Sequence, residues 1–119
     1  MAFVIEQRGK VLVRQRPQGV VNAHLWEFPN VEVKFKTRSP EKIAAALFGV
    51  PTSIRGSLRR IKHSITRYRM TLEPYFARPQ KRLPVNVGVW VSRNRVKQLA
   101  FSSAHRKVLK MVDERGTFR

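Results

Sequence analysis

The sequence predicts a mixed α+β domain in which β-strands predominate. Short stretches of alternating apolar and polar side chains recur along the chain, with turn residues between them. Two segments combine helix-start residues with an apolar stripe at helical spacing. The chain has 119 residues, 42% of them hydrophobic, which suffices for one core. Because no internal repeat or long linker interrupts it, we expect residues 1–119 to form a single domain.

The strand-like stretches have a defined order. They are expected at residues 2–7, 10–16, 25–28, 31–36, 58–65, 68–76 and 85–91. The first two flank Arg8-Gly9, where glycine supplies the left-handed residue of a tight hairpin turn. Only Thr66-Arg67 separates the two strands of a second hairpin. Residues 78–84 are expected to form a basic loop closed by prolines.

Helix signals occur at three places. Ser39 is a predicted N-cap, Pro40 suits the first helical position, and Glu41 is favourable at the positive end of the helix dipole. This helix is expected to end at Gly49, and its apolar face consists of Ile43, Ala44, Leu47 and Phe48. Residues 93–99 predict a short helical turn. Ser103 is expected to cap a final helix, whose apolar stripe consists of Ala104, Val108, Leu109, Met111 and Val112.

The chain is strongly basic. It has 25 Lys and Arg against 7 Asp and Glu, a formal net charge of +18. That charge on a small domain predicts a polyanionic partner, most often nucleic acid; a ribosome-associated or merely basic surface is the alternative. No apolar run approaches the roughly 18 residues of a membrane span, and no leader opens the chain. We therefore expect a soluble intracellular domain with no membrane partner.

Residues that commonly carry catalysis are scattered. Cysteine is absent, which excludes disulfides, thiolate metal sites and cysteine nucleophiles within the chain. Among the carboxylates only Asp113 and Glu114 are adjacent. The histidines, at positions 24, 63 and 105, lack the spacing of metal ligands. The sequence therefore predicts no catalytic residue and no metal site.

Four blocks follow one another along the chain. They are residues 25–29 (Leu-Trp-Glu-Phe-Pro) after residues 14–17, residues 63–70 (His-Ser-Ile-Thr-Arg-Tyr-Arg-Met), residues 89–91 (Val-Trp-Val) and residues 99–107 (Leu-Ala-Phe-Ser-Ser-Ala-His-Arg-Lys). In this order they resemble the C-terminal domain of MutY-type adenine DNA glycosylases, and the resemblance covers nearly the whole chain. The first block also occurs, in looser form, in Nudix proteins, so the series is more specific than any single block.

The resemblance implies a Nudix-like fold, in which helices pack against the faces of a mixed sheet. It implies that the partner is double-stranded DNA with an 8-oxoguanine·A mispair, and that the domain acts in base excision repair in the bacterial cytoplasm. In this family the adenine-cleaving chemistry belongs to a separate N-terminal glycosylase domain with an iron–sulfur cluster. We therefore expect this domain to be monomeric, to need no cofactor, to be non-catalytic alone, and to adjoin that catalytic domain if it is part of a longer chain.

Two alternatives to this reading remain. The first is a Nudix-type pyrophosphohydrolase acting on a nucleotide diphosphate. The glutamate-rich signature of those enzymes is missing, because residues 40–51, where it would fall, hold one carboxylate, Glu41. Magnesium on a pyrophosphate needs several oxygen ligands, so we expect no hydrolysis. The second alternative is a general DNA- or RNA-binding module that uses only the charge.

Reading 8-oxoguanine requires an acceptor for its N7–H group and a donor for O8. A hydroxyl can accept and donate at once. In the family, a serine at the tip of a strand-to-strand turn has this role, and the resemblance implies it for Thr66, which keeps the hydroxyl. Ile65 replaces the family's phenylalanine, and Arg67 replaces its histidine with a guanidinium that can contact phosphate or stack on a base. Lesion recognition is therefore assigned to Ile65, Thr66 and Arg67.

Further basic residues bracket this turn and continue in the predicted loop. Contacts with the DNA backbone are assigned to Arg59, Arg60, Lys62, Arg69, Arg78, Lys81 and Arg82. Trp26 and Phe28 are interpreted as packing residues rather than base-stacking platforms. His63 is interpreted as a strand residue with a local hydrogen bond.

Overall fold

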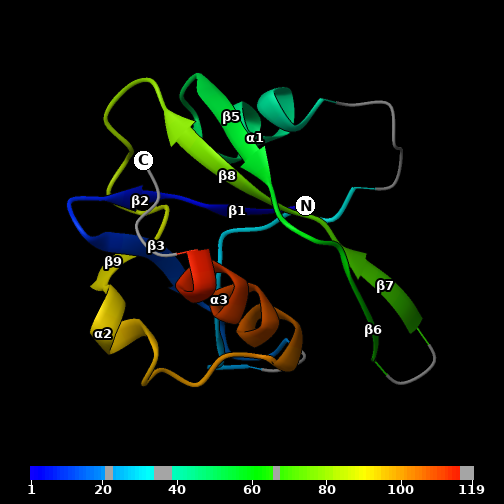
Figure 1. Cartoon of the computed structure of the whole chain (residues 1–119). Helices are drawn as coiled ribbons and strands as arrows, with labels where there is room; N and C mark the ends of the chain where they lie inside the picture. The colour runs from blue at the N-terminus through cyan, green and yellow to red at the C-terminus, as the bar shows by residue number, and fades with distance from the viewer. Residues whose placement is uncertain (21–22, 34–38, 66–67, 116–119) are drawn as a thin grey trace.

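Strands outnumber helices in the computed structural model, which describes residues 1–20, 23–33, 39–65 and 68–115. This confirms the predicted α+β class. The elements in chain order are β1 (Ala2–Val4), β2 (Glu6–Gln7), β3 (Lys10–Gln15), β4 (Trp26–Glu27), α1 (Pro40–Phe48), β5 (Thr52–Ser57), β6 (Ile61–Ile65), β7 (Tyr68–Leu72), β8 (Pro74–Pro79), β9 (Val89–Ser92), α2 (Arg93–Val96) and α3 (Ser103–Arg115). Figure 1 shows α1 and α3 on opposite sides of the strands.

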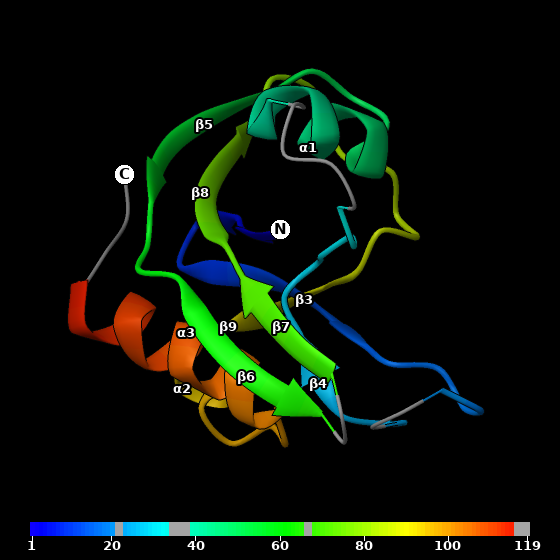
Figure 2. The same ribbon diagram turned by 90° about the vertical axis from the view of Figure 1, so that its right-hand side faces the viewer.

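The strands form two small sheets and a separate hairpin. In the first sheet β8 lies between β1, to which it is parallel, and β5, to which it is antiparallel. In the second, β3 pairs antiparallel with β2, β4 and β9. β6 and β7 pair only with each other among the described strands. Figure 2 shows this hairpin crossing in front of α3.

Strand β3 is apolar on both faces because helices cover both. Successive side chains of a strand point in opposite directions. Val11 and Val13 therefore join the core cluster that contains α3 residues, whereas Leu12 joins the cluster that contains α1 residues. All three are at most 1% exposed. This explains an unbroken apolar run in an otherwise alternating sequence.

The helices begin and end close to the predicted residues. The Ser39 hydroxyl accepts a hydrogen bond from the Lys42 amide at 3.2 Å, and Gly49 ends α1 with a left-handed φ of 73°. For α3 the predicted cap is wrong by one residue: Ser103 is the first helical residue, and the Ser102 carbonyl accepts from the Arg106 amide at 2.8 Å. In the described part of the chain, none of the helices has the length and apolar character needed to cross a bilayer.

Two predicted strands are each divided between sheets. Residues 2–7 split at Ile5, since β1 pairs with β8 while β2 pairs with β3. Residues 68–76 split at Glu73, whose carbonyl accepts from the Ala2 amide at 2.9 Å. The apolar alternation runs through both breaks. Periodicity therefore could not show where the chain changes partner.

Two other predicted strands are shorter or absent. Residues 25–28 form a strand only at Trp26–Glu27, because the Phe28 amide donates to a histidine ring instead of a neighbouring strand. Residues 31–33 form no strand, and residues 34–36 lie outside the described residues. Val31 and Val33 pack against the α1 cluster while Glu32 is exposed. Their alternation therefore reflects burial without strand pairing.

The second half differs in four places. Residues 58–60 precede β6 instead of belonging to it, and β8 continues to Pro79, so the basic loop begins at residue 80. Only Val89–Ser92 of the valine repeat is a strand, and Val85 is 95% exposed. Strand β5 was not predicted; its short alternation is interrupted by a register shift between Ile54 and Gly56.

Candidate nucleic-acid interface

The β6–β7 arm, as we call the hairpin of these two strands, projects from the sheets (Figures 1 and 2). Ile61 and Leu72 pair at its base and are buried in the cluster that contains α3 residues. Lys62 and Arg69 lie beyond this base and are exposed. Arg69 pairs with Ser64, which is two residues from Lys62, so both cations lie on the same face of the arm.

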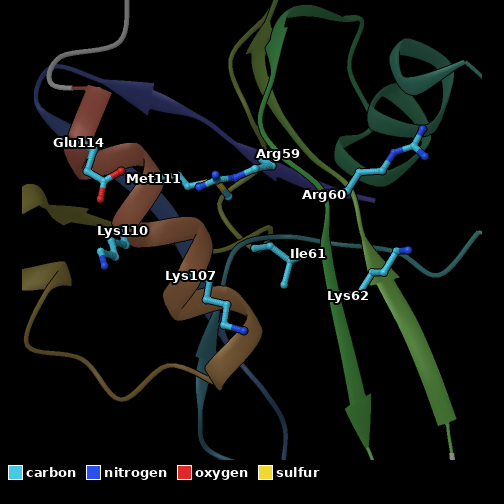
Figure 3. Close-up of a pocket in the computed structure, with 8 residues that line it drawn as sticks. All are labelled: Arg59, Arg60, Ile61, Lys62, Lys107, Lys110, Met111 and Glu114. Atoms are coloured by element: carbon cyan, nitrogen blue, oxygen red, sulfur yellow. The ribbon is translucent and has the colours of Figure 1, made fainter.

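A basic groove of about 390 Å³ lies between β6 and α3. This arm groove is lined by Arg59, Arg60, Ile61, Lys62, Lys107, Lys110, Met111 and Glu114. Figure 3 shows Arg59 extending toward α3 and Lys107 extending toward β6, so positive side chains come from both walls. Glu114 is the one carboxylate in the lining.

Most cations of the arm and its groove lack a carboxylate partner. Arg60 Nη2 lies 3.6 Å from Glu73 Oε2, and the arginine side chain is 68% exposed. An exposed pair of this kind contributes little to stability. Within the described part of the chain, no ion pair is formed by Arg59, Lys62, Arg69, Lys107 or Lys110. Their charge is therefore available to an anionic ligand.

The cations of α3 were not predicted as site residues from the sequence. Lys107 and Lys110 are three residues apart and share the groove side of α3, while Val108 and Val112 face the core. Their helical spacing was a usable signal. What the spacing could not show is that this side of α3 lies opposite β6.

The seven predicted backbone contacts fall into two separate groups. Arg59, Arg60, Lys62 and Arg69 lie on or beside the β6–β7 arm. The others lie at the far end of β8: Arg78 within the strand, and Lys81 and Arg82 in the loop after it. In Figure 1 that loop and the arm are at opposite ends of the molecule. One continuous basic surface is therefore not formed by all seven.

The predicted lesion-reading turn is described only at its edge. Ile65 ends β6 and pairs with Tyr68 at the start of β7. Thr66 and Arg67 lie outside the described residues. His63 lies in β6, as interpreted, but the expected local hydrogen bond is wrong for the described residues, among which its side chain has no hydrogen-bond partner.

The Leu-Trp-Glu-Phe-Pro block is a structural junction. Glu27 is 3% exposed, and its carboxylate accepts from Arg14 Nε at 2.7 Å and from an Arg16 Nη at 2.8 Å. Burial acts to raise the pKa of Glu27, but the two guanidinium hydrogen bonds outweigh it and lower the pKa. Arg14 also donates to the Asn30 carbonyl at 2.8 Å. The motif therefore ties β3 to the segment that follows β4.

Phe28 and His105 connect this junction to α3. The Phe28 amide donates to His105 Nδ1 at 3.1 Å, and the two rings stack with centroids 6.1 Å apart. Burial lowers the pKa of His105 to about 4, a stronger influence than the raising effect of nearby Glu27. Phe28 is fully buried and Trp26 packs against the same core. The interpretation of both aromatic residues as packing residues is confirmed.

Comparison with known proteins defines the family. The family model of the NUDIX domain matches residues 1–111. The chain belongs to this family. No curated protein sequence matches the chain.

Solved NUDIX-fold structures superpose over almost the whole chain. The E. coli ORF135 protein has a TM-score of 0.77 at 21% identity and covers 97% of this chain and 88% of its own. The C-terminal domain of mouse MUTYH, solved in complex with human PCNA, has a TM-score of 0.69 at 25% identity and covers 98% and 88%. Shewanella oneidensis NrtR, complexed with a 27mer DNA, has a TM-score of 0.70 at 17% identity and covers 96% and 59%.

The residues of this NUDIX domain do not fit the magnesium site of the family's hydrolases. Such a site needs several carboxylate oxygens from one region of the fold. Glu41, at the exposed start of α1, is the one carboxylate of residues 40–51. Across the described residues, no three His, Asp or Glu side chains lie close enough together to hold a metal ion.

Magnesium is accordingly expected to leave this NUDIX domain unchanged. A ligand that binds the folded state and not the unfolded state raises the melting temperature, and the rise grows with the ratio of ligand concentration to Kd. We expect the same Tm with and without Mg²⁺, and no phosphate or pyrophosphate release from nucleoside diphosphate substrates. Calorimetry and a phosphate-release assay measure the two quantities. A higher Tm in magnesium together with nucleotide cleavage would contradict the expectation.

Proposed function

We propose that this NUDIX domain is the lesion-recognition domain of a MutY-type adenine DNA glycosylase, and that it binds duplex DNA containing 8-oxoguanine opposite adenine through the β6–β7 arm. The observation that carries the proposal is the set of unpaired cations on the arm and on the facing side of α3. The likeness to the MUTYH C-terminal domain supports the assignment to this group of repair proteins.

The arm suits a duplex backbone. Six cations lie on the arm or line its groove: Arg59, Arg60, Lys62, Arg69, Lys107 and Lys110. A two-stranded ribbon is narrow enough to enter the major groove of DNA, where guanine N7 is displayed. The cations at the base of the arm can then contact phosphates on either side, which position the protein without reading sequence.

The residues between β6 and β7 would then read the base. Guanine N7 is an acceptor, whereas 8-oxoguanine has N7–H as a donor beside O8. The Thr66 hydroxyl can accept from N7–H and donate to a neighbouring acceptor. Arg67, next to it, supplies a guanidinium for a phosphate contact. Discrimination of the lesion therefore rests on Thr66, and general affinity rests on the surrounding cations.

The experiment compares affinities for 8-oxoguanine·A and G·A duplexes at one salt concentration. Thr66→Ala leaves the lesion's N7–H without an acceptor, which typically costs about 1–3 kcal/mol, or roughly 5- to 150-fold in affinity. We expect this loss only on the lesion duplex. Thr66→Ser is the matched control, because it keeps the hydroxyl and should keep the preference.

Arg67→Ala separates the two roles. If Arg67 contacts phosphate, its removal weakens both duplexes alike and reduces the salt slope by about one unit. Equal losses on both duplexes for Thr66→Ala would instead show that Thr66 is a turn residue, and the proposed lesion-reading role would be wrong.

A further inference from the structure

A second basic cavity lies at the end of the fold opposite the β6–β7 arm. It has a volume of about 960 Å³ and lies between the β2–β3 hairpin and the loop joining β8 to β9. We call it the loop cavity. In Figure 1 the β8–β9 loop descends beside β2. None of the arm cations lines it.

The lining of the loop cavity combines positive charge with an aromatic ring. Four cations line it, and the lining includes no carboxylate: Arg8, Lys10, Lys81 and Arg82. All four are exposed, and none forms an ion pair within the described part of the chain. Trp90 also lines the cavity and is only half-buried, so part of its indole is open to a ligand.

The loop is held firmly against the sheet. A Cβ atom placed on Gly88 would lie 2.7 Å from the Val13 carbonyl oxygen and 3.0 Å from a methyl carbon of Leu12, so only glycine allows this approach. Trp90 pairs with Leu12 in the β9–β3 ladder and packs on the α1 cluster. The aromatic wall therefore packs against the core, while the cations lie on the β2–β3 hairpin and on the loop after β8.

We propose that the loop cavity binds single-stranded nucleic acid, with a base stacked on Trp90 and neighbouring phosphates contacted by Arg8, Lys10, Lys81 and Arg82. Bases of a duplex are stacked on each other and cannot present a face to an indole. An unpaired strand exposes both base faces and backbone, and proteins bind it by combining aromatic stacking with a basic groove. The exposed Val85, at 95%, adds apolar surface beside the cations. This site is independent of the proposed duplex contact.

Fluorescence of Trp90 provides a direct test. The chain has two tryptophans, so Trp26→Phe leaves Trp90 as the only one and keeps an aromatic packing residue at position 26. Titration with an eight-nucleotide oligothymidylate should quench the Trp90 emission to saturation. Trp90→Leu should weaken binding of a labelled oligothymidylate by roughly 5- to 150-fold, the usual effect of losing one stacked base.

Two charge-matched double variants locate the contact. Lys81→Ala with Arg82→Ala should weaken oligothymidylate binding and reduce its salt slope by about 1.4, from roughly −0.7 for each phosphate contact. Lys81 and Arg82 line the loop cavity and not the arm groove, so the duplex contact first assigned to them is not part of the proposed duplex site, and this variant should leave duplex affinity through the arm largely unchanged. Lys62→Ala with Arg69→Ala removes the same charge from the arm. This variant should weaken duplex binding and leave oligothymidylate binding largely unchanged.

The outcomes separate this site from the duplex site. Unchanged Trp90 emission at saturating oligothymidylate, or equal loss of oligothymidylate binding in the two double variants, would overturn the proposal. Neither result bears on the lesion preference of the arm, which is measured separately with the 8-oxoguanine·A and G·A duplexes. If the unaltered domain does not bind the duplex while oligothymidylate still quenches Trp90 emission, the proposed function is overturned and the single-strand site is retained.

Discussion

Duplex affinity is expected to fall roughly 10³-fold between 50 and 200 mM salt. Each phosphate neutralised by a cation releases condensed counterion, so the slope of log K against log salt is about −0.9 for each contact. If the six cations of the arm and its groove all engage phosphates, the slope is about −5. Titrations of a labelled duplex at several salt concentrations measure it. A slope near zero would contradict the proposal that this domain binds nucleic acid.

Single variants show whether the arm produces this slope. Lys62→Ala should flatten it by about one unit, because one phosphate contact is lost. Lys42→Ala is the matched control, since Lys42 is also exposed but lies on α1, away from the arm (Figure 1). An equal change in the two variants would mean that overall charge, rather than the arm, determines duplex binding.

The stability of the fold is expected to decrease on acidification between pH 6.5 and pH 4. Burial lowers the pKa of His105 from its ordinary 6.5 to about 4, so the folded state holds this ring neutral. Between those values the unfolded chain binds a proton that the folded chain excludes. The free energy of unfolding should therefore be fully retained above pH 6.5 and fall by about 3 kcal/mol toward pH 4. The lowered pKa of Glu27 adds a loss in the same direction at more acidic pH.

Urea unfolding at a series of pH values measures this dependence. His105→Asn should flatten the curve above pH 4, because asparagine does not titrate there and its amide oxygen can still accept from the Phe28 amide. The variant should be less stable at neutral pH, because the smaller side chain fills less of the core. His24→Asn is the control: His24 is exposed with a φ of 68°, a conformation that asparagine tolerates. An unchanged pH dependence in His105→Asn would exclude His105 as its source.

The helices and the first hairpin turn could be predicted because their signals are local. Ser39, Pro40 and Gly49 act on backbone groups within a few residues, and the apolar stripe of α3 repeats with the helix itself. Residues 40–51 contain one carboxylate, so the poor fit to a hydrolase magnesium site is likewise evident from the sequence. Each of these conclusions depends on residues close together in the chain.

Strand boundaries depended on partners remote in sequence. Glu73 divides one apolar alternation because its carbonyl pairs with the amide of Ala2, more than 70 residues earlier. Val31 and Val33 alternate with an exposed glutamate yet form no strand, because burial alone produces the same pattern. β5 was not predicted because a register shift interrupts its alternation. It is a strand because it pairs with β8, which lies more than 15 residues later in the chain.

The candidate site divides in the same way. Charge on the arm was visible in the sequence, since a two-residue connection brings the cations of both strands together. Only the tertiary structure placed Lys107 and Lys110 of α3 across a groove from β6, and separated Lys81 and Arg82 from the arm. The sequence determined how much positive charge this domain has and which residues provide it. The packing of α3 and the course of β8 decided that the charge forms two surfaces, because contacts between distant segments depend on the shared core and not on local pattern.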